Sequence, residues 1–271
     1  MDIIKLSNNL NIISSPVNVS VYDFNFELFF ECSHPLYFNQ GDIGILRLGA
    51  IDDYESVYNE WYSQGLTLIN TPSEHYKASE LSEWYPIISD LTPESICVNE
   101  FPPYETIEKQ FGWPVFIKGS RQTSKHNAEL SVAHNNSEYE AIISKYRNDP
   151  ILHWQKIAIR EFIQLQKVPG QVANKVNPSL EFRTFWLHGT CVGWGQYWYQ
   201  VPKYSSNGIE AGLAIASEAA KRLNVPFIVI DIAMTNSGKW IIIECNDAQE
   251  SGYASIHAQN LWQSVIEKIH A

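Results

Sequence analysis

Three oxygen-bearing side chains interrupt two apolar runs in FIVIDIAMTNSGKWIIIECND, residues 227–247. The turn-forming sequence TNSG separates the runs, so this segment is predicted to form a β-hairpin. A turn centred within TNSG places Asp231 opposite Glu244, and the alternation of side chains along a strand puts Asn246 on the same face. Two carboxylates and an amide oxygen on one patch are the hard ligands that Mg²⁺ accepts. The hairpin is therefore a candidate metal site.

An alternative explanation is that these side chains simply face solvent from an edge strand. A single carboxylate in a strand is most often of that kind. Here, however, two carboxylates lie opposite each other in a very apolar hairpin, where like charges repel. A bound cation would relieve that repulsion, and we therefore favour the metal interpretation.

A second group of polar residues lies in PVFIKGSRQTSKHN, residues 114–127. The apolar run is predicted to form a strand that delivers Lys118 at its end, and the following loop carries hydroxyl groups and further cations. Such a loop suits a polyphosphate. The GxxxxGK[ST] spacing of a Walker loop is absent, and a strand rather than a helix is expected to follow. A solvated hairpin loop with ordinary surface charges explains these residues equally well.

Two further apolar strands carry charged residues. In KIAIREFIQL, residues 156–165, Glu161 and the neighbouring backbone have the groups needed to contact the edge of an adenine ring, although an ordinary amphipathic strand has the same pattern. In SLEFRTFWLHGT, Arg183 alternates with bulky apolar residues. It is expected to pair with Glu181 or Asp231, or to face an anionic reactant.

The order of the predicted elements indicates a chain with both helices and strands. The 271 residues are 45% hydrophobic, which is enough for the core of one large or two smaller domains. A strand over 42–50, a helix over 52–65 and a strand over 66–70 form the unit from which parallel sheets are built. The expected fold class is therefore α/β.

The region that follows is expected to link this unit to the chemistry-bearing segments. A single amphipathic helix is predicted over 73–91, with Ser73 or Ser79 as its N-cap. The loop after it is rich in proline and polar residues, so the main domain boundary is expected near residues 93–103.

Charge and composition exclude several classes of partner. A formal net charge of −11 argues against nucleic acid or an anionic membrane as the main partner. No apolar run approaches the roughly 20 residues of a membrane span, and the first residues, MDIIKLSNNLN, do not have the pattern of a secretory signal. The scattered cysteines are expected to be buried thiols in a reducing compartment, which predicts a cytoplasmic protein: Cys32, Cys97, Cys191 and Cys245.

Four segments in this order together resemble the ATP-grasp superfamily: PVFIKG, AIREFI, EFRTFWLHG and the hairpin IDIAM–G–WIIIECND. The resemblance covers roughly residues 66–268, and the ending ECNDAQESGY is similar to that of a clade of small bacterial and phage proteins. It implies an ATP-grasp fold, α/β (α+β), in which two subdomains sandwich a nucleotide. The implied organisation is an N-terminal parallel α/β domain over 1–95 and an ATP-grasp domain over 96–271, with a lid over about 114–160 and a metal-binding subdomain over about 161–271.

The resemblance also implies ATP and Mg²⁺ as cofactors and assigns roles by position. ATP would be bound by Lys77, Lys118, Arg121, Lys125, Glu161, Phe162 and Ile163. Catalytic charge stabilisation would come from Lys118 and Arg183. Mg²⁺ would be held by Asp231, Glu244 and Asn246. The substrates would meet Lys203, Asp247, Gln249 and Ser251.

One departure from the family lies in the loop after Lys118. This loop is usually rich in glycine, whereas here GSRQTSKHN contains only Gly119. Closure over the phosphates is therefore expected to use the side chains of Arg121 and Lys125 in place of backbone amides.

The activity implied by the resemblance is that of a carboxylate–amine ligase. A carboxylate would attack the γ-phosphorus of ATP to give an acyl phosphate and ADP, and an amine would then displace phosphate. The implied partners are small-molecule or peptide carboxylates and amines, and a homodimer is common among similar proteins. Two other classes stay open, namely a phosphotransferase with the same nucleotide site and a regulatory nucleotide-binding protein without catalysis.

Overall fold

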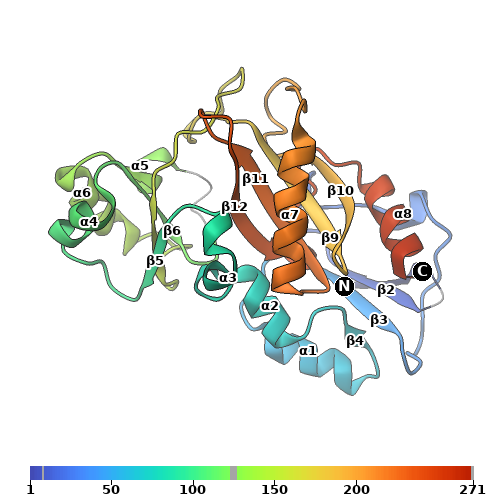
Figure 1. Cartoon of the computed structure of the whole chain (residues 1–271). Helices are drawn as coiled ribbons and strands as arrows, with labels where there is room; N and C mark the ends of the chain where they lie inside the picture. The colour runs from blue at the N-terminus through green and yellow to red at the C-terminus, as the bar shows by residue number, and fades with distance from the viewer. Residues whose placement is uncertain (8, 123–126, 270–271) are drawn as a thin grey trace.

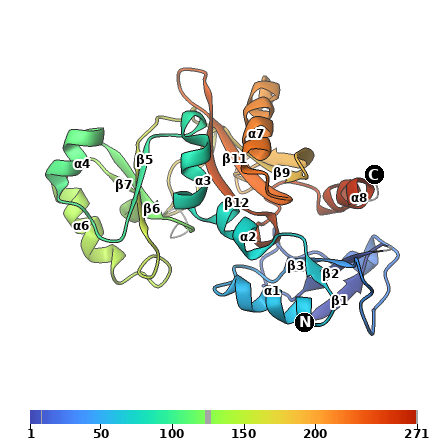
Figure 2. The same cartoon turned by 60° about the horizontal axis from the view of Figure 1, so that its bottom comes forward.

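The protein is described by a computed structural model that covers residues 1–7, 9–122 and 127–269. These residues form three four-stranded sheets, which we call the N-terminal, middle and C-terminal sheets. The middle sheet forms a lobe on the left, while the N-terminal sheet packs beneath the C-terminal sheet (Figures 1 and 2). The predicted combination of helices and strands is confirmed.

The N-terminal sheet contains the predicted strand–helix–strand unit. Its strands lie in the order β1 (Asp2–Lys5), β2 (Leu10–Ser14), β3 (Ile43–Arg47) and β4 (Thr67–Leu68). Helix α1 (Tyr54–Ser63) connects β3 to β4, and these two strands are parallel, as expected for such a unit. The side chains of Ile13, Leu46 and Trp61 form part of the core beneath α1.

The predicted single helix over 73–91 is instead two helices, α2 (Pro72–Ser79) and α3 (Leu81–Ile88). Glu80 between them is extended, and the Leu81 amide that this break frees donates to the Ser120 carbonyl, 3.0 Å away. The N-cap is Thr71, not Ser73 or Ser79, because Thr71 and Glu74 form a reciprocal capping box. The sequence contains this Thr-x-x-Glu signal, with proline at the first helical position.

Removal of this cap gives a first test of the structure. Thr71→Ala is expected to lower the free energy of unfolding by about 1 kcal/mol, because the Glu74 amide loses its acceptor. Ser73→Ala, two residues away, is the matched control and is expected to change stability by less than about 0.5 kcal/mol. Urea denaturation of both variants measures the difference, and equal stabilities would show that Thr71 is not the cap.

The middle sheet is antiparallel and joins distant parts of the chain. Its strands lie in the order β5 (Ser95–Val98), β8 (Ile157–Glu161), β6 (Val115–Gly119) and β7 (Val132–Ala133). It is accompanied by α4 (Tyr104–Phe111), α5 (Ala128–Ser131) and α6 (Asn136–Tyr146). The expected strand after the loop at 119–127 is corrected here, since the short helix α5 comes first. The sheet also starts at Ser95, before the expected lid boundary at 114.

The C-terminal sheet is buried on both faces. Its strands lie in the order β10 (Thr190–Gln196), β9 (Glu181–Leu187), β11 (Phe227–Met234) and β12 (Trp240–Asp247). Helix α7 (Ile209–Leu223) covers one face, where Ile230 and Ala216 share a core. Helix α8 (Ala258–Ile269) covers the other face, where Val229 and Trp262 pack with Ile12 of the N-terminal sheet. Asp231 and Arg183 continue this second face beyond its apolar part.

Two expectations about composition are resolved by the model. Among the residues described, no helix is long and apolar enough to cross a membrane. Of the cysteines, only Cys245 is buried, whereas Cys32, Cys97 and Cys191 are half-buried. The expectation of four buried thiols is therefore wrong for three of them, because they lie at partly covered edges of the sheets and loops.

Candidate functional site

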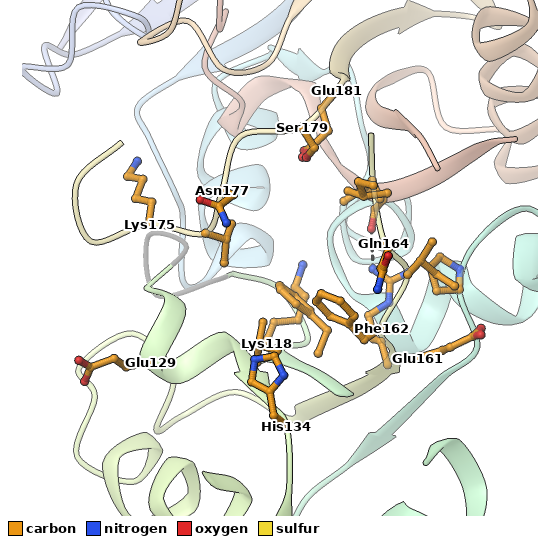
Figure 3. A pocket seen from close by; sticks show the side chains of 18 of the residues that line it. Lys118, Glu129, His134, Glu161, Phe162, Gln164, Lys175, Asn177, Ser179 and Glu181 are labelled. Atoms are coloured by element: carbon orange, nitrogen blue, oxygen red, sulfur yellow. Dashed lines mark hydrogen bonds between the residues drawn. The ribbon is translucent and has the colours of Figure 1, made fainter. Parts of the chain in front are cut away.

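A cavity of about 1020 Å³ lies between the middle and C-terminal sheets. One wall is formed by Phe116 and Lys118 of β6, and the facing wall contains Glu181 of β9 and Glu244 of β12. In Figure 3, Lys118, Phe162 and His134 lie below the cavity, and Ser179 and Glu181 lie above it. Its size is in the range of pockets that hold ligands of a few dozen atoms.

The segment that leaves β8 forms the apolar end of the cavity. Phe162 and Ile163 line it, as does Glu161, and Phe116 and Ile243 complete the apolar surface. The Glu161 carboxylate points away from Lys118 in Figure 3 and is exposed. The predicted position of these three residues at one site is therefore found, but it is the backbone and the apolar side chains of this segment that face the cavity beside Lys118.

Lys118 is held at the cavity by its strand and by a close neighbour. Its side chain is only 4% exposed, and its ammonium group contacts the Glu244 carboxylate across the cleft. Gly119 follows because a Cβ there would lie 2.2 Å from the Gln155 amide oxygen. That oxygen accepts the Arg121 and Gln122 amides at 2.9 and 2.8 Å, so Gln155 fixes the base of the loop.

The predicted hairpin register is confirmed at the carboxylates. Asp231 of β11 pairs with Glu244 of β12, and Val229 pairs with Asn246. Nearer the turn, Ile232 pairs with Ile242, so Ile243 is an extra residue and forms a β-bulge. This bulge was not predicted, and it divides the hairpin just beside Glu244.

Both carboxylates of the hairpin are paired with cations. Arg183 donates to Asp231 through Nε and Nη2 at 2.9 and 2.7 Å, so of its two predicted partners Asp231 is the one it contacts. Burial alone would lower the pKa of Arg183, but the Asp231 carboxylate outweighs burial and raises it. Burial in turn raises the pKa of Asp231, although Arg183 opposes this. These bonds keep the pair ionised inside the protein.

The donor types of the hairpin fit a hard cation. Asp231, Glu244 and Asn246 offer two carboxylates and an amide oxygen on neighbouring positions of one face. The part of the chain that the structure describes contains no cluster of three or more His, Cys, Asp or Glu side chains suited to a metal. Any metal here would therefore need oxygen atoms from its own ligand as well, as Mg²⁺ commonly has from phosphates.

Glu181 also belongs to the site, although the sequence suggested it only as a partner for Arg183. Its carboxylate accepts hydrogen bonds from the Ser179 hydroxyl and from the Trp198 indole, the latter at 3.0 Å. Burial raises the pKa of Glu181 to about 7, these two donors oppose the rise, and Asp231 and Glu244 add to it. Since Leu180 N donates to Gln166 O, Glu181 lies beside the segment that follows Ile163.

This pKa predicts a pH dependence of stability. Glu181 titrates near 4.5 when unfolded and near 7 when folded. Between these values the folded state keeps a proton that the unfolded state has lost, so stability falls as the pH rises from 4.5 to 7 and stays low above it. Relative to Glu181→Gln, the wild type is expected to lose about 3 kcal/mol over this range. Urea denaturation across pH measures both curves, and parallel curves would contradict the assignment.

Arg121 does not reach the cavity. Its Nη2 atom donates to the Ile51 carbonyl at 2.8 Å, to His75 at 2.8 Å and to Glu250 at 3.0 Å. It therefore links the base of the loop to the N-terminal domain and to the turn after β12. Its expected part in binding phosphate stays a prediction that would require these contacts to break. Lys125, its expected companion, lies outside the described residues.

The predicted substrate residues after the hairpin are buried. Asp247 accepts a hydrogen bond from Gln249 N at 2.8 Å and contacts His75 at 3.0 Å. Gln249 accepts the Leu46 amide and donates to the Tyr54 hydroxyl. Ser251 donates to the Asp247 carbonyl at 2.9 Å. The structure thus places Asp247, Gln249 and Ser251 in a buried network with the N-terminal sheet.

Three other predicted residues do not line the cavity: Lys77, Lys203 and Asn246. Lys77 is half-buried on α2, and Lys203 is exposed after β10. Asn246 is half-buried, two residues beyond Glu244 on β12. The structure therefore brings together Lys118, Glu161, Phe162, Ile163 and Glu244 around the cavity, with the Arg183–Asp231 pair beside them.

The fold is that of ATP-grasp proteins. D-alanine–D-alanine ligase from Bacillus anthracis, solved with ATP, has 15% sequence identity and a TM-score of 0.58, covering 83% of this chain and 77% of its own. VanG D-Ala:D-Ser ligase from Enterococcus faecalis has 15% identity and a TM-score of 0.59, covering 84% and 69%. A RimK domain ATP-grasp protein from Sphaerobacter thermophilus has 15% identity and a TM-score of 0.53, covering 77% and 73%.

The sequence also assigns the family. The family model that matches is described as an ATP-grasp domain, family 3 of its clade, and it matches residues 76–265. This is more than half of the chain, and the protein belongs to this ATP-grasp family. No curated protein sequence matches the chain. The suspected resemblance to ATP-grasp proteins is thereby confirmed.

Proposed function

We propose that this protein is an ATP-dependent carboxylate–amine ligase that uses Mg²⁺. The observation that carries the proposal is the pair of cation–carboxylate contacts at the cleft, Lys118–Glu244 and Arg183–Asp231. Side chains of opposite sign with low exposure, drawn from two different sheets, are suited to bind an anionic ligand together with its metal. The ligases of similar fold support this class of reaction.

ATP fits the cavity in one direction. The adenine would lie against the apolar end, between Phe116 and Phe162, with the Ile163 backbone at its edge. Glu181, on the same side of the cavity, would accept hydrogen bonds from sugar hydroxyls, which a carboxylate can do without repelling phosphate. The phosphates would then extend toward Lys118.

The chain's own cations would stabilise the charge of the reaction. In the first step a substrate carboxylate oxygen forms a bond to the γ-phosphorus while the bond to the bridging oxygen breaks, so that ADP leaves. In the second step an amine attacks the acyl carbon, phosphate leaves and the amine gives up a proton. Lys118 and Arg183 would stabilise the oxygen atoms that gain negative charge. Mg²⁺ held by Asp231, Glu244 and Asn246 would add neutralisation of the phosphates.

Trapping with hydroxylamine tests this proposal directly. Purified protein is incubated with ATP, Mg²⁺, hydroxylamine and a panel of amino acids, peptides and small carboxylic acids. A ligase is expected to release ADP and to form a hydroxamate with at least one carboxylate, because only an acyl phosphate is trapped in this way. ADP release with a stable phosphate ester and no hydroxamate would instead identify a phosphotransferase.

A further inference from the structure

The bulge at Ile243 decides where Glu244 points. On one side of it Ile232 pairs with Ile242, and on the other Asp231 pairs with Glu244. An extra residue of this kind leaves the ladder locally unpaired and redirects the side chains beside it. Without Ile243 as an extra residue, Glu244 would move by one position, and a shift of one residue exchanges the two faces of a strand.

The bulge is held from outside its own sheet. Arg160 of β8 donates from Nη1 to the Ile243 carbonyl at 2.6 Å. Its Nη2 donates to the Thr92 hydroxyl at 2.6 Å, and that hydroxyl in turn donates to the Ile242 carbonyl at 2.8 Å. The two carbonyl groups at the bulge thus each receive a hydrogen bond from this arginine–threonine pair.

The guanidinium group is well suited to this position. Arg160 is 4% exposed, its Nε donates to the Ser95 hydroxyl at 2.9 Å, and its partners in these three bonds are neutral oxygen atoms. Burial lowers its pKa to about 10, so it remains charged at neutral pH. A planar fork can bond to β5, to the linker before it and to β12 at once, whereas a lysine ammonium on a flexible stem cannot hold this geometry.

We propose that Arg160, together with Thr92, is a positioning residue that fixes the bulge and so aims Glu244 at Lys118 and the cavity. The inference rests on the proposed nucleotide site and extends it to residues that do not themselves coordinate the metal. Arg160 also connects the two sheets that enclose the cavity, since β8 and β12 belong to different sheets. The geometry of the metal ligand and the spacing of the cleft walls therefore depend on one side chain.

Two measurements on Arg160→Lys and Thr92→Val test the inference. The first is calorimetric titration with ATP at increasing Mg²⁺ and in EDTA. The Mg²⁺ concentration needed for half-maximal ATP binding is expected to rise about tenfold in both variants, while metal-free binding changes less than about twofold. The second is hydrogen exchange without ligand, in which amides of residues 240–247 are expected to exchange faster and those of β9 and β10 are expected to be unchanged.

Ser95→Ala is the matched control, because it removes a hydrogen bond from the same guanidinium group on the β5 side and leaves the bulge contacts in place. Its Mg²⁺ requirement is expected to stay within about twofold of wild type. Folded variants that keep the wild-type Mg²⁺ requirement and exchange pattern would overturn the role of Arg160. A wild type that binds no ATP at all would instead contradict the proposed function and with it the site that Arg160 serves.

Discussion

Replacing Lys118 with methionine is expected to weaken ATP binding about 100-fold, which corresponds to about 2.7 kcal/mol. Lys118 is almost fully buried and contacts Glu244, so its loss removes the cation from the phosphate side of the cavity and leaves a carboxylate facing the ligand. Charge-assisted hydrogen bonds to buried groups are worth about 1.5–3 kcal/mol each, and repulsion by Glu244 adds to that loss. Calorimetry with Mg²⁺ and ATP measures the affinity directly.

Lys109→Met provides the control for charge alone. Lys109 lies exposed on α4 of the same lobe, so its substitution changes the net charge equally. Its ATP affinity is expected to stay within about twofold of wild type. If Lys118→Met and Lys109→Met bound ATP equally well, the cavity beside Lys118 would not be the phosphate site.

The Arg183–Asp231 pair is expected to show the largest effect on stability. Arg183→Met leaves the Asp231 carboxylate, 2% exposed, without its partner, and breaking a buried pair of this kind costs about 3–5 kcal/mol. The double variant Arg183→Met/Asp231→Leu removes both charges and is expected to regain most of that loss, because two apolar groups then occupy the site. Urea denaturation measures both changes.

Activity separates the structural role of this pair from its chemical role. ADP release is expected to fall at least about 1000-fold in Arg183→Met, and the double variant is expected to stay inactive although it is stable. Recovery of activity together with stability in the double variant would show that Arg183 only supports the fold. Equal stability of Arg183→Met and the wild type would contradict the buried ion pair itself.

Local signals predicted the hairpin well and the bulge not at all. The turn sequence and the alternation of side chains were sufficient to place Asp231 opposite Glu244, as the structure confirms. Ile243, however, is one of several isoleucines in a row, and nothing in its type distinguishes the extra residue from its neighbours. The bulge is instead stabilised by Arg160, more than 80 positions earlier in the chain, at a contact that local patterns do not reveal.

The residues predicted around the reacting end show the same limit. Arg121 was expected on phosphate because of its loop, yet the fold brings it to His75 and Glu250, and Asp247 also meets His75. These contacts join three segments that are distant in sequence, so residue type and spacing could indicate charge but not the partner. Prediction succeeded where the positioning element was a single strand, as for Lys118.

The most direct test of a nucleotide site at the hairpin is calorimetric titration of ATP into the wild type with Mg²⁺, repeated in EDTA and with Asp231→Asn. Saturable binding that requires Mg²⁺ and is strongly weakened by the substitution is the predicted result, with folding of the variant checked by circular dichroism. Absence of ATP binding by the folded wild type, or binding that neither EDTA nor Asp231→Asn changes, would contradict the assignment of Mg²⁺ and ATP to this hairpin.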